Sequence, residues 1–126
     1  MDKCAEERQM LANEFLECQK LITALGNETR QSIIITLLNS EHVGLRVGEI
    51  TEKTHLSRPA VSHHIKILKD AKIVAMRKKG TMNFYYVDID NTEWIKLKML
   101  VNHIDSIIYQ AVNQSYPDNH LGYDEE

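Results

Sequence analysis

The segment 57–74, SRPAVSHHIKILKDAKIV, joins a helix-start signal to two adjacent histidines and evenly spaced lysines. Ser57 is a preferred N-cap residue, and Pro59 is tolerated in a first turn, where its missing N–H would have no intrahelical partner. These signals predict a helix over 57–71. The adjacent histidines admit three interpretations: a metal site, a general base or a nucleic-acid contact.

The helical period gives this segment one apolar face and one basic face. Val61, Ile65 and Leu68 share the face that we expect to pack in the core. His63 points away from that face, whereas His64 lies nearer the core boundary, where a neighbour would satisfy its ring. The outward face carries the residues that we expect to contact a polyanion, namely Arg58, Ser62, His63, Lys66 and Lys69.

The histidine pair suits nucleic acid better than metal binding or catalysis. Adjacent helical residues point in different directions, whereas metal ligands on a helix lie three or four residues apart. A general base would need a nucleophile or a carboxylate partner, and the surrounding residues are basic. Ser62 and His63 can instead bond to base edges. Lys66 and Lys69 can neutralise phosphates, so we expect double-stranded DNA as the partner, and neither a metal nor a cofactor.

The composition is that of a small soluble protein. The 126 residues are 43% hydrophobic and 26% charged, which fits a single domain with its own core. No apolar run approaches the roughly 20 residues that span a bilayer, and the first ten residues lack the apolar core of a signal peptide. Cys4 and Cys18 are too few for a disulfide scaffold, although a cross-subunit disulfide or soft-metal pair stays open. We expect a cytoplasmic protein without membrane contact.

Charge is unevenly distributed along a chain whose net charge is −3. Residues 55–80 hold seven lysines and arginines against a single acid, Asp70, whereas the first 28 residues and the last eleven are acidic on balance. A basic middle can bind a polyanion locally although the whole chain is mildly acidic. The alternative is a lysine-rich face that serves solvation alone.

Apolar periodicity and turn signals predict the other elements. Three helices are expected before 57–71, over 5–25, 28–39 and 47–54, and Asn27 can cap the second of them. GLRV at 44–47 is expected to form a short strand.

Two strands are expected within 73–88, joined through KKGT, in which Gly80 supplies the turn and Arg77 and Lys79 flank the tip. Helix-turn-helix followed by a β-hairpin is the winged-helix arrangement. The expected fold class is therefore mainly α with a small β-hairpin wing.

The first and last helices carry apolar stripes that a winged helix does not need. Asp90 and Glu93 have the spacing of a capping box at the start of the last helix. Burying one Leu or Ile side chain is worth about 1.5–3 kcal/mol, so two uncovered stripes should pair with a second copy. The expected dimer-interface residues are Leu11, Phe15, Cys18, Trp94, Leu97, Val101, Ile104 and Ile108. Residues 1–115 are thus expected to form one domain with terminal dimerisation helices, and 116–126 a polar, flexible tail.

In order and spacing, three segments resemble the ArsR/SmtB family of small winged-helix bacterial repressors: LGNETRQSIIITLL, VGEITEKTHLSRPAVSHHIKILKDAKIV and RKKGTMNFYYVD. The resemblance covers residues 21–90, and its most specific part is LS-x-x-AVSHHIK-x-L followed by a basic hairpin with a central glycine. It implies a homodimer that reads an inverted-repeat operator and is released by an inducer. On matching positions it implies DNA contacts by Ser57, Arg58, Ser62, His63 and Lys66, with Arg77 and Lys79 in the wing.

The chain departs from the family where inducers bind. VGEITEKT at 47–54 lacks the cysteine cluster of one metal-sensing type, and DID at 88–90 has aspartate where another type has histidine. Within the expected last helix, His103 is the only histidine downstream of this segment, and it is out of register. The resemblance therefore implies no metal site and leaves the inducer unknown. Arg46 stands where the family has a small capping residue, which predicts a weakly capped third helix.

These features together predict a homodimeric, sequence-specific transcriptional regulator, a repressor that reads its operator with 57–71 and the wing 73–88. The sequence contains no glycine-rich phosphate loop, catalytic triad or metal cluster, so we expect no enzymatic activity. The alternative is a winged-helix protein-interaction module without operator reading, in which Ser62→Ala with His63→Ala would leave function intact. The basic block over 55–80 argues against that alternative.

Overall fold

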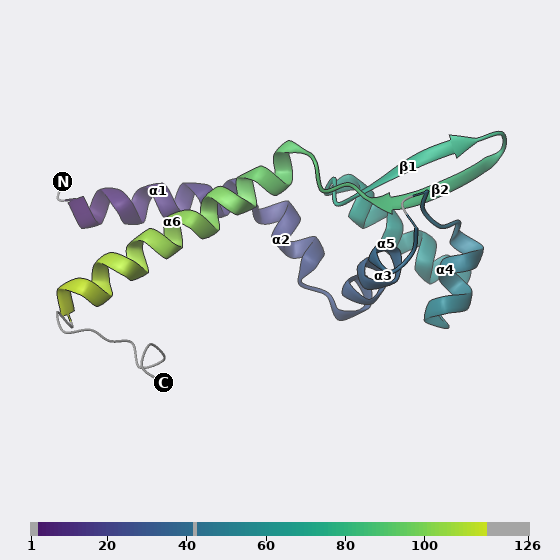
Figure 1. Ribbon diagram of the computed structural model, residues 1–126, viewed down its shortest axis with the longest axis horizontal. Helices are drawn as coiled ribbons and strands as arrows, with labels where there is room; N and C mark the ends of the chain where they lie inside the picture. The colour runs from purple at the N-terminus through teal and green to yellow at the C-terminus, as the bar shows by residue number, and fades with distance from the viewer. Residues whose placement is uncertain (1–2, 42, 116–126) are drawn as a thin grey trace. The chain divides into compact units, whose positions relative to one another are not determined.

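The computed structural model describes residues 3–41 and 43–115, whose elements are drawn in Figure 1. In chain order they are α1 (Lys3–Glu17), α2 (Gln19–Leu25), α3 (Glu28–Leu38), α4 (Val47–Thr54), α5 (Arg58–Asp70), β1 (Val74–Lys79), β2 (Met82–Val87) and α6 (Thr92–Ser115). The predicted fold class, mainly α with one β-hairpin, is confirmed. Residues 18–94 form one compact unit, and the described parts of 1–17 and 95–126 form another. The single domain over 1–115 stays a prediction, and the expected tail 116–126 lies outside the described residues.

The core of the unit 18–94 lies where α3, α4 and α5 pack on one another. Ile33 of α3, Ile50 of α4 and Leu68 of α5 are fully buried. Val61 and Ile65 are buried on the same side of α5 as Leu68, so the apolar face predicted for this helix is confirmed. Each such side chain contributes about 1.5–3 kcal/mol on burial. The packing therefore sets which face of α5 remains outside.

The helix predicted over 5–25 is wrong as a single element. It breaks between α1 and α2 at Cys18, whose φ of −95° and ψ of 0° leave the helical region. Cys18 is also buried, so an apolar residue occupies the break and the apolar spacing runs across it unchanged. The next boundary is as predicted, because the Asn27 side chain accepts from the Arg30 N–H at 2.9 Å and caps α3.

The hairpin after α5 has the predicted strands and turn. Strands β1 and β2 pair antiparallel with Lys79 opposite Met82, which leaves a two-residue loop. Gly80 has a φ of +63° and Thr81 has a negative φ, the pattern of a type II′ turn. This turn matches the twist of the strands and follows directly on the basic end of β1, Arg77–Lys79.

The strand predicted at 44–47 is reduced to a single bridge. Leu45 and Tyr85 exchange backbone hydrogen bonds of 2.9 and 2.8 Å. Gly44 has a φ of +95°, and a Cβ on it would lie 2.5 Å from the Tyr85 carbonyl oxygen. Only glycine fits this approach, which ties the hairpin to the segment before α4.

The cap of α6 is Asn91 rather than the predicted Asp90. Asn91 Oδ1 accepts from the Glu93 N–H at 2.9 Å, and its Nδ2 donates to the carbonyl oxygens of Lys72 and Asp88. A side-chain amide has donors as well as an acceptor, whereas an ionised carboxylate only accepts. Asn91 can therefore cap α6 and join it to the end of α5 at the same time.

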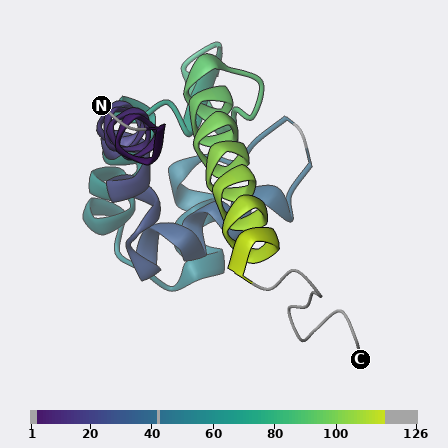
Figure 2. The same ribbon diagram turned by 90° about the vertical axis from the view of Figure 1, so that its left-hand side faces the viewer.

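The second unit contains α1 and most of α6. Helix α6 is continuous along its length (Figure 2). The Glu14 carboxylate of α1 lies 2.7 Å from Nδ1 of His103 in α6, and Leu100 is buried. Among the described residues, this unit leaves eight large apolar side chains exposed: Met10, Phe15, Leu16, Ile95, Met99, Val101, Ile108 and Tyr109. Within the described ranges, no helix has the length and apolar character needed to cross a membrane.

Gly44→Ala should lower the free energy of unfolding by about 2–4 kcal/mol, because the new Cβ meets the Tyr85 backbone and the residue must keep a positive φ. Gly80→Ala is the matched control. Its φ is also positive, but no atom lies within 4 Å of the added Cβ. We expect a loss of about 1 kcal/mol there. Urea unfolding followed by circular dichroism measures both, and equal losses would contradict the close approach at Gly44.

Candidate nucleic-acid interface

The outward face of α5 is open to solvent. The six candidates on or just before this helix are all exposed: Ser57, Arg58, Ser62, His63, Lys66 and Lys69. Because Val61, Ile65 and Leu68 are buried on the other side, these polar residues cannot turn inward without unpacking the core. Lys66 Nζ lies 3.4 Å from Asp70, but both side chains are exposed, so the pair is weak and the lysine stays available to an anion.

Ser57 has a structural role at the start of α5, as predicted. Its Oγ accepts from the Ala60 N–H at 3.2 Å, and its extended backbone (φ −73°, ψ 157°) is that of an N-cap residue. The hydroxyl proton is still available to an acceptor, because the cap uses only the oxygen lone pair.

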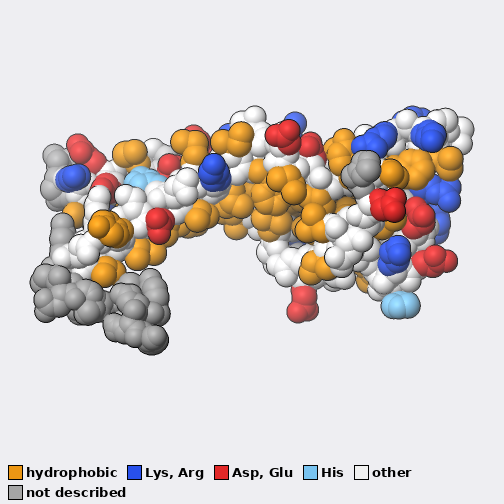
Figure 3. All heavy atoms as spheres, in the orientation of Figure 1, with side chains coloured by type: hydrophobic (Ala, Val, Ile, Leu, Met, Phe, Trp, Pro, Cys, Tyr) orange, Lys and Arg blue, Asp and Glu red, His pale blue; other side chains and the backbone are white. Residues whose placement is uncertain are grey.

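The hairpin presents Arg77, Lys78 and Lys79 to solvent, and basic side chains gather around this end of the unit (Figure 3). Arg77 Cζ lies 4.9 Å from the centroid of the Tyr86 ring, a cation–π distance. Strand residues alternate faces, so Arg77 and Lys79 share one face of the hairpin and Lys78 takes the other. Two of the three charges therefore point the same way.

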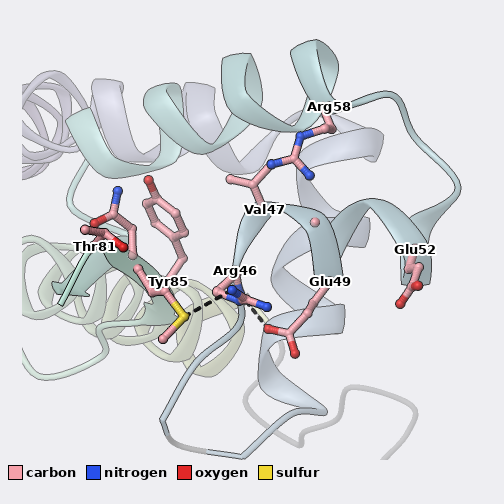
Figure 4. Close-up of a pocket in the computed structure, with 10 residues that line it drawn as sticks. Arg46, Val47, Glu49, Glu52, Arg58, Thr81 and Tyr85 are labelled. Atoms are coloured by element: carbon pink, nitrogen blue, oxygen red, sulfur yellow. Dashed lines mark hydrogen bonds between the residues drawn. The ribbon is translucent and has the colours of Figure 1, made fainter. Parts of the chain in front are cut away.

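Arg58 lies against α4 instead of projecting freely from α5. A Cβ on Gly48 would be 3.0 Å from Arg58 Nη1, so the glycine makes room for the guanidinium. Arg58 lines a groove of about 530 Å³ between α4, the start of α5 and the hairpin turn (Figure 4). Glu49 and Glu52 line it as well, so the surroundings of Arg58 are of mixed charge.

Arg46 also lines this groove, although it was not among the predicted DNA contacts. Its Nη1 donates to Met82 Sδ at 3.1 Å, which holds the guanidinium at the hairpin. An arginine side chain has no acceptor with which to cap α4. Glu49, in the first turn of α4, provides the side-chain contact at this N-terminus instead: its Oε1 accepts from the Arg46 N–H at 2.9 Å. A glutamate three residues after the cap position was the signal for this contact.

His64 is half-buried and has the neighbour that its position predicted. Arg30 Nη1 lies 3.4 Å from its Nδ1. Burial, then the charge of Arg30 and then His63 hold the pKa of His64 below its usual value. His63 stays on the exposed face, with its ring centroid 5.4 Å from that of His64 and the planes 63° apart. The two histidines thus have different environments, and within the described ranges no three His, Cys, Asp or Glu side chains are placed to hold a metal ion.

The predicted dimer-interface residues differ in exposure. Phe15, Val101 and Ile108 are about half exposed, and Cys18 is 2% exposed. The other four are intermediate: Leu11, Trp94, Leu97 and Ile104. Cys18 is therefore already packed within one chain, as its place in an apolar stripe indicates.

Comparison with known proteins relates this arrangement to transcriptional regulators. Residues 27–75 match the profile of a family described as "Bacterial regulatory protein, arsR family". The chain is 38% identical over 85 residues to the uncharacterized HTH-type transcriptional regulator MJ1325 of Methanocaldococcus jannaschii, covering 67% of this chain and 93% of that protein. It is 37% identical over 91 residues to the transcriptional activator HlyU of Vibrio cholerae, covering 72% of this chain and 77% of HlyU.

A solved structure shows the same fold. The ArsR-like transcriptional regulator from Rhodococcus sp. RHA1 superposes with a TM-score of 0.70, over 86% of this chain and 98% of that one, at 20% sequence identity.

Ser57→Ala should lower the free energy of unfolding by about 1 kcal/mol, because the first turn of α5 loses its cap. Ser62→Ala is the matched control on the same helix, where the hydroxyl is exposed. We expect it to change stability by less than about 0.5 kcal/mol. Thermal and urea unfolding of both variants provide the measurement; the capping role would be refuted by equal effects.

Proposed function

Because the chain belongs to the arsR family of bacterial regulatory proteins, we propose that it is a homodimeric repressor that reads an inverted-repeat operator with α5 and the β1–β2 hairpin. The chain is a DNA-binding transcriptional regulator and not an enzyme. What we propose beyond this is that the protein is a homodimer, that it reads an inverted-repeat operator, that it represses transcription and that it acts in the cytoplasm. The observation that carries it is the exposed polar face of α5.

The dimensions and side chains of α5 suit the major groove. The helix has 13 residues, and a major groove admits one α-helix. Ser62 and His63 are exposed in its first two turns, where recognition helices contact base edges. Lys66 and Lys69 follow on the same side and can neutralise phosphates at the groove edge.

The hairpin extends the contact to the neighbouring backbone or minor groove. Arg77 is steadied on the Tyr86 ring and carries the planar cation that suits a narrow minor groove. Lys79 and the Gly80 turn stand at the exposed end of the hairpin. Each phosphate that such a residue neutralises adds about 0.9 to the slope of log affinity against log salt.

The second unit supplies a surface for a second copy. Its eight exposed large apolar side chains lie on α1 and α6, and exposed apolar groups of this kind mark interaction sites. A twofold axis would present two α5 helices to major grooves about 34–36 Å apart. A monomer would neutralise too few phosphates for useful affinity at cellular salt.

Repression is the simplest consequence of such binding, because a dimer on an operator within a promoter excludes the polymerase. The related HlyU is named an activator. A reporter fused to the promoter of the protein's own gene distinguishes the two directions. Expression that rises when the gene is deleted supports repression, and expression that falls shows activation.

Operator reading is tested by fluorescence anisotropy with a duplex from the promoter of the protein's own gene and a scrambled duplex. We expect the first to bind at least about a thousandfold more tightly. Ser62→Ala with His63→Ala should reduce this ratio by about tenfold or more, since base contacts contribute about 1–3 kcal/mol each. Equal binding of both duplexes would contradict the proposal, and regulation that survives the double substitution would favour the protein-interaction module.

Lys79→Gln should weaken binding to both duplexes alike and lower the salt slope by about one, because one phosphate contact is lost. Lys98→Gln is the matched control, since it removes the same charge from an exposed lysine of α6. Anisotropy titrations over a range of salt concentrations measure both slopes. A wing that does not touch DNA would leave the two slopes equal.

Val101→Asp should convert the dimer to a monomer, because it places a charge on the exposed apolar surface of α6. Ile35→Asp is the matched control: Ile35 is 57% exposed, similar to the 53% of Val101, but lies on α3 in the unit 18–94. Sedimentation velocity reports the oligomeric state of each variant. If Val101→Asp stays dimeric and Ile35→Asp becomes monomeric, the dimer interface lies on the unit 18–94 and the proposed interface is wrong.

A further inference from the structure

Arg30 is the meeting point of three helices. Its Nε donates to the Ala24 carbonyl oxygen at 2.8 Å, and its Nη2 donates to the Thr23 carbonyl oxygen at 3.3 Å. Both carbonyl groups belong to the last turn of α2, where helix carbonyls need partners from outside the regular helix. The Thr23 oxygen also accepts from the Gly26 N–H at 3.2 Å. The third nitrogen, Nη1, lies 3.4 Å from Nδ1 of His64 in α5. One planar guanidinium on α3 thus joins the end of α2 to the recognition helix.

The Arg30 backbone is held as firmly as its side chain. Its N–H donates to the Asn27 cap at 2.9 Å, so the residue sits in the first turn of α3 with a fixed direction. A guanidinium presents its donors in a rigid fork, and two of them are already committed to α2. The position of Nη1 beside His64 is therefore determined by α2 and α3, and not by α5 itself.

The contact requires a neutral His64. Nη1 carries only donors, so Nδ1 must be the unprotonated, accepting nitrogen of the ring. Protonation of Nδ1 would remove the acceptor and set an imidazolium cation against the guanidinium cation. The contact with α3 would then become a repulsion.

We propose that Arg30 is a positioning residue for α5 and that protonation of His64 breaks this contact and weakens operator binding. The inference rests on the proposed operator binding and adds a pH-dependent control to it. His64 follows Ser62 and His63 directly, so a shift of the helix at His64 moves the groups expected to read bases.

The electrostatics of the site agree with the geometry. Burial first, then Arg30 of α3 and then His63 of α5 lower the pKa of His64. Helix α4 and strand β1 also pack on α5. Among their described residues, none is a charged or titratable group that shifts the pKa of His64. When the contact is broken the ring regains its usual pKa, so the broken state binds more protons. The contact is thus complete above the usual pKa and is lost as pH falls through the lowered pKa.

The neighbouring histidine should respond in the opposite sense. His63 is exposed on the DNA-facing side, so its protonation adds a positive charge next to phosphates and favours binding. Of the two adjacent histidines, His64 is the one in contact with Arg30. A substitution of His63 therefore serves as the matched control for a substitution of His64.

The experiment compares operator and scrambled-duplex affinities at about pH 8.0 and about pH 5.5 for the full chain, His64→Asn and His63→Gln. Asparagine keeps an accepting oxygen near the Nδ1 position and does not titrate. We expect the specific affinity of the full chain to fall by about three- to tenfold on acidification. His63→Gln should show at least the same fall, and His64→Asn should show none. Circular dichroism at each pH verifies that every protein is folded during the titration.

Nuclear magnetic resonance of the histidine rings provides a readout that a merely structural role would not produce. The titration midpoint of His64 should lie below the usual value of a histidine and should rise in Arg30→Gln, because a positive charge beside the ring is removed. A midpoint that is unchanged in a folded Arg30→Gln variant would overturn the role of Arg30.

The outcomes separate this inference from the proposed function. Absence of specific binding at about pH 8.0 refutes operator reading itself. Specific binding with no loss at the lower pH, or a loss that persists in His64→Asn, overturns the inference alone. His103 contacts Glu14 in the other unit and is unchanged in all these proteins, so the comparison between variants isolates the substituted histidine.

Discussion

Burial of one face of α5 is the constraint on which the proposed DNA-binding surface depends. Val61, Ile65 and Leu68 leave almost no surface to solvent, and truncation of Ile65 or Leu68 to alanine would cost about 2–5 kcal/mol. The helix therefore has one orientation, and Ser62 and His63 are directed outward by side chains that never meet DNA. The groups that we propose to read DNA are therefore positioned by packing in the core.

Polar contacts at the ends of elements then join the rest of the unit 18–94 to this helix. Asn91 connects the end of α5 to the start of α6, and the Leu45–Tyr85 bridge connects the hairpin to the approach to α4. Arg30 does the same for α2 and α3 through His64. Asn91, the Leu45–Tyr85 bridge and Arg30 all bond to backbone groups at the ends of elements, so the bonds that complete the elements also set their relative positions.

The adjacent histidines illustrate how little sequence proximity says about role. His63 is exposed beside lysines, whereas His64 is half-buried against a guanidinium and has a lowered pKa. A metal site would have required both rings to converge on one point, and the helical twist separates them by about 100°. One ring faces the expected DNA, and the other faces the scaffold of α2 and α3.

Local patterns in the sequence were sufficient for the apolar face of α5, the caps at Asn27 and Ser57, and the place of the hairpin turn at Gly80, because each depends on residues within about one helical turn or one hairpin loop. Tertiary structure alone decided the break at Cys18, the cap by Asn91, the seating of Arg58 against Gly48 and the contact between Arg30 and His64, which are 34 residues apart. Apolar spacing determines which side of a helix is buried. The partner of a polar group depends on which backbone or side chain the completed packing brings within hydrogen-bonding distance, and no local pattern contains that information.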